Sequence, residues 1–93
     1  MSTFAVTYHY TDDVAKRDEV RPTHREFLLG LHAEGVVRAS GPADGGSGAL
    51  VIVEADSADA ALSILDADPF VAQGVVAERS ARQWEVVIGG FAE

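Results

Sequence analysis

The chain has 93 residues, of which 47% are hydrophobic and 24% charged, a balance that predicts one folded domain over residues 1–93. Its 15 acidic and 7 basic residues give a net charge of −8, which argues against nucleic-acid and anionic-membrane partners. It has no cysteine, which excludes disulfides and thiolate chemistry, and with no signal-peptide pattern and no apolar run long enough to cross a membrane, we expect a cytoplasmic protein.

The first predicted element is a strand over residues 3–10. Phe4, Val6, Tyr8 and Tyr10 fall on one side and smaller or polar residues on the other. Period-two alternation of aromatic and β-branched side chains is typical of a strand with one buried face.

A helix is predicted over residues 20–35, where the hydrophobic period changes. At 100° per residue one face collects Val20, His24, Phe27, Leu28, Leu31 and Gly35. Pro22 suits the first turn, where its missing N–H costs least, and Gly35 suits the C-terminal cap. Arg25 is expected to point away from the buried face.

A hairpin follows. We expect a strand over Val36 to Gly41 that is stopped by Pro42, then a turn over residues 43–47, then a strand over Ala49 to Ala55. Residues 50–53 are apolar at every position, which favours a central place in the sheet for this strand.

The last third predicts a helix over residues 58–66 with Ser57 as its N-cap. Asp68 followed by Pro69 predicts a second, short helix start that ends at Gly74. A final strand is expected over residues 75–89, with Trp84 in the core or in a dimer interface, and residues 91–93 form a tail.

The order β-α-β-β-α-β predicts an α+β, ferredoxin-like fold with two helices on one face of a four-stranded antiparallel sheet. The other face of the sheet cannot be wholly polar, because the third strand is apolar on both sides. A second copy packed sheet to sheet is the simplest cover, so we expect a homodimer.

His24 is the first candidate for chemistry, because it interrupts an apolar stripe. A partly desolvated imidazole responds strongly to a nearby carboxylate and suits general acid–base catalysis. The alternative is a core histidine satisfied by one hydrogen bond.

Asp68 is the second candidate, as the carboxylate that orients His24 and stabilises its imidazolium. Its alternative role is the N-cap of the short helix. The two roles are compatible, since one carboxylate oxygen can cap while the other faces a cleft.

Weaker candidates surround a possible small-molecule site. Ser40, Gly41 and Pro42 lie at a strand end where small residues let a ligand approach the backbone, although a hairpin also needs Gly and Pro. Arg21 could pair with an anionic substrate group, or stand solvated. A Ser40–His24–Asp68 triad is not favoured, because no nucleophile-elbow motif surrounds Ser40. The three histidines lack metal-site spacing, and we expect no metal and no cofactor.

The sequence resembles the YciI-like, YCII-related family over nearly its whole length. The resemblance is carried by the order and spacing of Arg21-Pro22-Thr23-His24, Leu28, Leu31, Gly35, Ser40-Gly41-Pro42, Asp68-Pro69-Phe70 and Gly74. It implies a dimeric α+β barrel, in which two sheets face each other, and an active site whose histidine and aspartate correspond to His24 and Asp68. Some members are linked with the breakdown of chlorinated aromatic compounds by a step like loss of HCl.

Two functional hypotheses follow, beside a third, structural one of a dimerisation domain with no ligand. One is a small enzyme in which His24 is the general acid or base and Asp68 its orienting partner, acting by elimination or isomerisation on a small organic molecule. Phe70, Tyr8 and Phe27 would line its apolar pocket. The other is a non-catalytic dimeric module that binds a small molecule or assists a partner enzyme. An open pocket shared by His24 and Asp68 would favour the enzyme, and a sealed pair would favour the module.

Overall fold

The computed structural model describes residues 1–90, so the tail predicted over residues 91–93 lies outside the described residues. The elements are β1 (Ser2–Tyr10), α1 (Val14–Ala33), β2 (Val37–Ala43), a short 3-10 turn η1 (Asp44–Gly46), β3 (Gly48–Ala55), α2 (Ala58–Leu65), α3 (Pro69–Ala72) and β4 (Val76–Gln83). This order confirms the predicted α+β class and the ferredoxin-like alternation.

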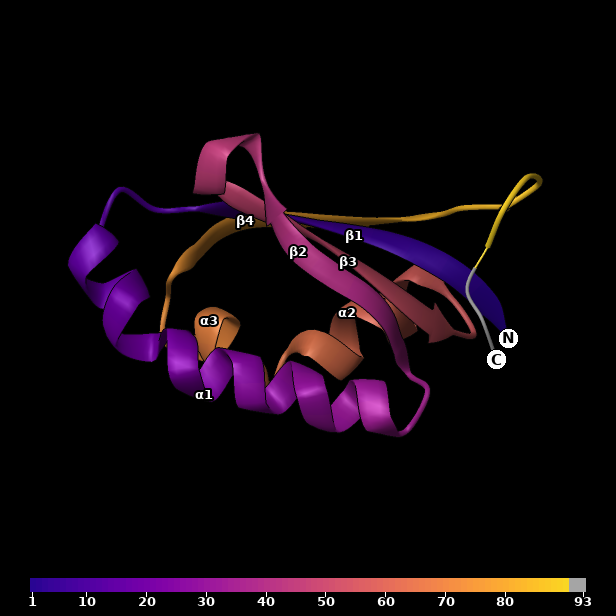
Figure 1. Ribbon diagram of the computed structural model, residues 1–93, viewed down its shortest axis with the longest axis horizontal. Coiled ribbons are helices and arrows are strands. Elements are labelled where there is room, and N and C mark those ends of the chain that lie inside the picture. Colours follow the sequence, from indigo (N-terminus) through magenta and orange to yellow (C-terminus); the bar gives the residue numbers. More distant parts are fainter. Residues whose placement is uncertain (91–93) are drawn as a thin grey trace.

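The four strands form one antiparallel sheet in the order β2-β3-β1-β4. The helices lie on one side of this sheet, with α1 running beneath it beside α3 (Figure 1). The apolar strand β3 is central, as predicted, because β1 and β2 pair with its two edges.

The core lies between the sheet and the helices. Alternate residues of β1 point into it, and the register sets each against a core residue of β3, with Val6 opposite Val51 and Tyr8 opposite Ala49. The helices add Leu28 and Leu65, both buried. Close packing of these side chains fixes the height of α1 above the sheet and thereby the position of His24.

Helix α1 begins six residues earlier than predicted, at Val14, where the Asp13 side chain accepts a hydrogen bond from the backbone N–H of Lys16 at 3.0 Å. The first two turns face solvent along most of their length, so they carry no apolar period. Placing Pro22 in the first turn was therefore wrong, since it lies inside the helix. Such a proline removes one backbone hydrogen bond from the helix.

Strand β2 continues past the predicted stop at Pro42 and ends at Ala43. Pro42 is paired with Ala49 of β3, and within residues 1–90 β2 is an edge strand with no neighbour on its other side. A proline is tolerated there, because an edge strand has backbone groups that no neighbour needs.

Strand β4 ends at Gln83, six residues before the predicted end. Gln83 is opposite Phe4, and the Trp84 N–H donates to Thr3 O at 2.9 Å, so β1 offers almost no backbone beyond this point. Val87 and Ile88 are consequently exposed, and the alternation seen there is not that of a strand. Trp84 is 43% exposed, which rules out a core position in the chain and leaves the interface as a prediction.

The predicted helix ends are confirmed by their caps. The Ser57 hydroxyl accepts from the Ala60 N–H at 3.0 Å and starts α2. Gly35 follows α1 with φ of 79°, a left-handed conformation that favours glycine, and its N–H donates to His32 O. Asp68 caps α3.

Candidate functional site

His24 lies on the buried face of α1, between Val20 and Leu28, as its place in the apolar stripe predicted. Its ring stacks face to face on Phe70, with centroids 3.8 Å apart and planes 4° from parallel. Only 7% of the residue is exposed. The stacking holds the imidazole plane in one orientation and aims its two nitrogens in fixed directions.

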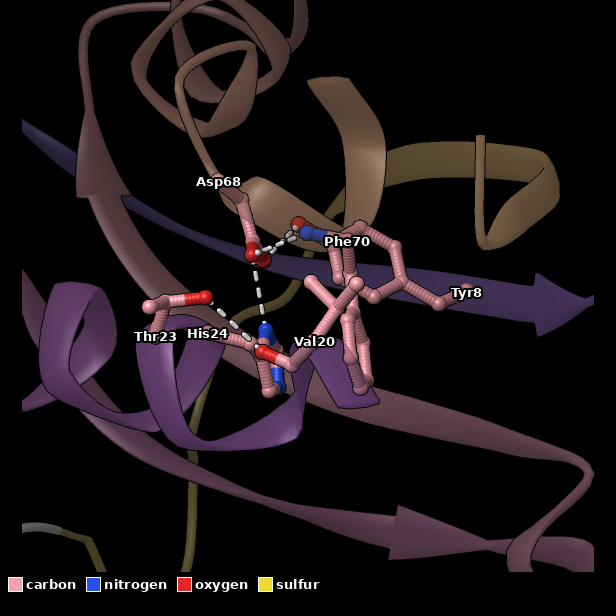
Figure 2. A network of polar contacts seen from close by, with 6 residues as sticks. All are labelled: Tyr8, Val20, Thr23, His24, Asp68 and Phe70. Atoms are coloured by element: carbon pink, nitrogen blue, oxygen red, sulfur yellow. Dashed lines mark hydrogen bonds and ion pairs between the residues drawn. The ribbon is translucent and has the colours of Figure 1, made fainter. Parts of the chain in front are cut away.

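Asp68 and His24, 44 residues apart in the sequence, form a buried pair. The Nδ1 of His24 lies 2.7 Å from Oδ1 of Asp68 (Figure 2). Asp68 is fully buried, and its side chain is supplied by the turn that connects α2 to α3. The predicted coupling of these two side chains is therefore present in the structure as a contact.

The Asp68 carboxylate accepts two further hydrogen bonds. The backbone N–H of Phe70 donates to Oδ1 at 3.0 Å, and the Tyr8 hydroxyl donates to Oδ2 at 2.9 Å. The expected division, with one oxygen capping and the other facing a cleft, was wrong. Oδ1 both caps α3 and meets His24, while Oδ2 is held by Tyr8 in the core.

This hydrogen-bond pattern assigns the proton on His24. A carboxylate can only accept, so the neutral imidazole carries its proton on Nδ1 and donates it to Asp68. The lone pair then lies on Nε2, which has no hydrogen-bond partner within residues 1–90. His24 thus presents a basic nitrogen on the side away from Asp68.

Tyr8 is a member of this network, although sequence reasoning placed it in the pocket wall and did not identify its contact with Asp68. Burial raises the pKa of its hydroxyl well above the usual value, and the neighbouring Asp68 raises this pKa further. Tyr8 therefore stays protonated and keeps donating to the carboxylate. Its position on the buried face of β1 was predicted, but no local pattern reveals which polar group its hydroxyl reaches.

His24 opens onto a pocket of about 550 Å³ between α1 and the edge of the sheet. Every predicted binding residue, Arg21, Ser40, Gly41, Pro42 and Phe70, lines this pocket together with His24. Asp68 does not line it and stands behind the imidazole. Further lining residues are Tyr10, Arg25, Leu28, Leu29, His32, Val37, Ala39 and Ala49.

The expected lining by Tyr8 and Phe27 was wrong. Tyr8 is fully buried and its hydroxyl donates to Asp68, and Phe27 packs against the hydrophobic core. On a helix with about 100° per residue, Arg25 and Leu28 lie on one flank of His24 and Phe27 on the other. The pocket occupies the first flank, so Arg25 lines it although it was expected to point away.

Few other side chains around the pocket could take part in catalysis or bind a metal. Ser40 makes no hydrogen bond to His24 in the structure. His32 lies farther along α1, where its Nδ1 is 2.8 Å from Val37 O and donates to it. Among residues 1–90 no three His, Asp or Glu side chains are grouped so as to hold a metal ion. In the same part of the chain no helix is both long and apolar enough to span a membrane.

The fold resembles that of a solved enzyme. The 5-chloro-2-hydroxyhydroquinone dehydrochlorinase TftG from Burkholderia phenoliruptrix AC1100, solved with 2,5-dihydroxybenzoquinone, superposes with a TM-score of 0.75. The match covers 89% of this chain and 93% of that one, at 24% sequence identity. At this identity the likeness shows a shared fold.

Curated proteins share more of the sequence. Protein YciI from Escherichia coli O6:H1 is 38% identical over 86 residues, which cover 82% of this chain and 88% of YciI. YjpA from Bacillus subtilis is 38% identical over 63 residues, covering 68% of this chain and 73% of YjpA. Residues 1–85 match the YCII-related domain. The chain therefore belongs to the YCII-related family.

Proposed function

We propose that this protein is an acid–base enzyme in which Nε2 of His24 exchanges a proton with a small organic molecule in the pocket. The observation that carries the proposal is the Asp68–His24 pair at the wall of an open pocket, with Nδ1 occupied and Nε2 unpaired. A core histidine can be satisfied by one hydrogen bond, but its second nitrogen would then be expected to be enclosed by the fold and not to lie at the wall of a pocket. This arrangement instead leaves one nitrogen for a ligand.

The geometry supports a distinct role for each of the two residues. Nε2 takes a proton from a C–H or O–H of the bound molecule, and the charge that develops on the imidazole is stabilised by Asp68 at 2.7 Å. The imidazolium then returns the proton, either to another atom of the same molecule in an isomerisation or to the medium after a leaving group departs. Phe70 and Asp68 hold the ring in place throughout, so little reorganisation is needed.

The dehydrochlorinase with the same fold supplies a class of test molecule. Loss of HCl from a chlorinated hydroquinone is an elimination that needs proton transfer and no redox partner. A His–Asp pair can supply that transfer. Similar chemistry on a small hydroxylated ring is the form of the proposal that we favour.

We also propose a cytoplasmic homodimer. On the open face of the sheet, Leu50 of β3 is 44% exposed and stands beside Ile52 and Ala5 on the same face. Covering this face with a second copy would bury Leu50, whereas Ile52 is already buried within the chain. The dimer would not need to contribute residues to the pocket, which lies on the helix side.

The experiment is a proton-exchange assay. Small hydroxyquinones and 5-chloro-2-hydroxyhydroquinone are incubated in D₂O, and ring C–H exchange and chloride release are followed by NMR and a chloride electrode. We expect His24→Gln to lower the rates by about 100-fold or more. Lys16→Gln, an exposed change on the same helix, should have no effect.

Equal rates for wild type and His24→Gln would overturn the proposal. Rates equal to those of buffer, for molecules that nevertheless bind in the pocket, would identify the chain as a binding module.

A further inference from the structure

Apart from the Tyr10 phenol, the ionisable side chains that line the pocket are all basic. They are Arg21, Arg25, His24 and His32, and no carboxylate of the described chain joins them. The chain as a whole carries 15 acidic and 7 basic residues. The basic lining is thus a local feature of an otherwise acidic protein, and its residues lie on one flank of α1.

The two arginines differ in how far their charge is already neutralised. Arg21 forms an ion pair with Asp18, with Nη1 and Oδ1 2.7 Å apart. Arg25 has no ion-pair partner within residues 1–90 and its residue is exposed at the pocket. Arg25 therefore offers an uncompensated guanidinium, the group best suited to bidentate recognition of a carboxylate or similar anion.

Arg17 adds to the positive side of the site. Its guanidinium lies over the Tyr10 ring, 5.3 Å from the centroid, and Tyr10 forms part of the pocket wall. The Nε of Arg17 is buried without a hydrogen-bond partner in the described chain. Arg17, Arg21 and Arg25 stand on successive turns of α1, so their side chains share one stretch of the helix surface.

Apart from Ser40, the side chains of the remaining lining are apolar. Leu28, Val37, Pro42 and the ring of Phe70 surround the space in front of His24. Arg21, Arg25 and His24 line the same pocket, so one small molecule bound there can contact an arginine and Nε2 together.

We propose that the pocket takes a small organic anion, with an acidic oxygen paired to Arg25 and Arg21 and an apolar ring against Phe70 and Leu28. This rests on the proposed function, since it names the substrate class of the same site. Asp68 does not oppose the anion directly, because it is fully buried behind the imidazole and its oxygens are held by three donors. The anion is held by the arginines while its body lies before Nε2.

The test compares acids with neutral partners of the same shape. The two probe pairs are 2,5-dihydroxybenzoquinone against 2,5-dimethoxybenzoquinone, and benzoate against benzamide. Binding is measured by NMR shifts of the Ser40 and Gly41 amides and by calorimetry at low and high salt. We expect at least one acid to bind at least about tenfold more tightly than its neutral partner, and salt to weaken the binding of that acid only.

Variants locate the charge that is recognised. Arg25→Gln should weaken acid binding by about tenfold, and Arg21→Gln by less, because Asp18 already neutralises part of its charge. Lys16→Gln removes the same charge from an exposed position outside the pocket and should change nothing.

Equal affinity for acid and neutral partner, no binding of either acid at millimolar concentration, or an Arg25→Gln variant that binds as wild type would each overturn the inference. These results do not depend on catalysis. Acid selectivity combined with rates unaffected by His24→Gln would refute the proposed function and leave the anion site standing.

Discussion

Replacing Tyr8 with Phe tests the buried network without touching the pocket. The hydroxyl donates to Asp68 Oδ2 at 2.9 Å, and both residues are fully buried. A hydrogen bond to a charged group contributes about 1.5–3 kcal/mol, so we expect Tyr8→Phe to lower the free energy of unfolding by about 2 kcal/mol near neutral pH. Urea denaturation followed by tryptophan fluorescence measures this difference.

The pH dependence makes the prediction specific. Burial, and then Asp68, raises the pKa of Tyr8 above the ordinary value of 10.0. The stabilising effect of the protonated Tyr8 hydroxyl is therefore complete below about pH 10 and declines above it, because ionisation of the tyrosine favours the unfolded chain. At about pH 11 the wild type should lose about 1.4 kcal/mol through this group, a loss that Tyr8→Phe cannot show.

The difference in unfolding free energy between wild type and Tyr8→Phe should consequently shrink from about 2 kcal/mol near pH 8 to about 0.6 kcal/mol near pH 11. Tyr10→Phe is the matched control at neutral pH, because the Tyr10 hydroxyl has no hydrogen-bond partner within residues 1–90, and it should cost less than about 0.5 kcal/mol. A gap that stays constant with pH, or a control as costly as Tyr8→Phe, would refute the reasoning.

Three further predictions, one of them with a matched control, test the fold and the dimer. Gly48→Ala should destabilise by about 1–3 kcal/mol in urea denaturation, because a Cβ there would lie 2.2 Å from Tyr8 O, whereas Gly30→Ala on exposed α1 meets nothing within 4 Å and should stabilise. Pro22→Ala restores an N–H inside α1 and should raise the unfolding free energy, by up to about 3 kcal/mol; an unchanged value would contradict the assigned helix. Leu50→Glu on the open sheet face should convert the proposed dimer to a folded monomer in analytical ultracentrifugation, and an unchanged mass would refute that interface.

Much of the fold was predictable because its signals are local. The period-two alternation of β1, the apolar run of β3 and the caps at Ser57 and Asp68 each depend on a few adjacent residues. Their order along the chain was sufficient to predict the sheet and the side on which the helices lie.

Errors arose where the decisive contact is distant or absent from the pattern. Helix α1 starts at Val14, but its first turns are too exposed to show an apolar stripe. The end of β4 at Gln83 is set by where β1 begins, which no property of residues 84–89 reveals. Pro42 stays in β2 only because that strand is at the edge of the sheet.

The site shows the same division. His24 stood out locally as a polar residue in an apolar stripe, and Asp68 as a cap. General acid–base reasoning and the resemblance to the family both paired them. Tyr8 was expected in the pocket wall, and its hydrogen bond to Asp68 was missed because it depends on the packing of β1 against the α2–α3 turn. Arg25 was missed because the pocket lies on one flank of α1 rather than on its buried stripe.

The central claim is that Asp68 holds the His24 proton on Nδ1 and leaves Nε2 as a base that faces the pocket. The most direct measurement is a ¹H–¹⁵N spectrum of the histidine rings across the pH range, in wild type and in Asp68→Asn, which retains a side chain able to cap α3. The account predicts the Nδ1–H tautomer for neutral His24 in the wild type, and a larger share of the Nε2–H tautomer in Asp68→Asn, whose neutral amide oxygen is a weaker acceptor than the carboxylate. An Nε2–H tautomer in the wild type, or the same tautomer populations in the two proteins, would contradict it.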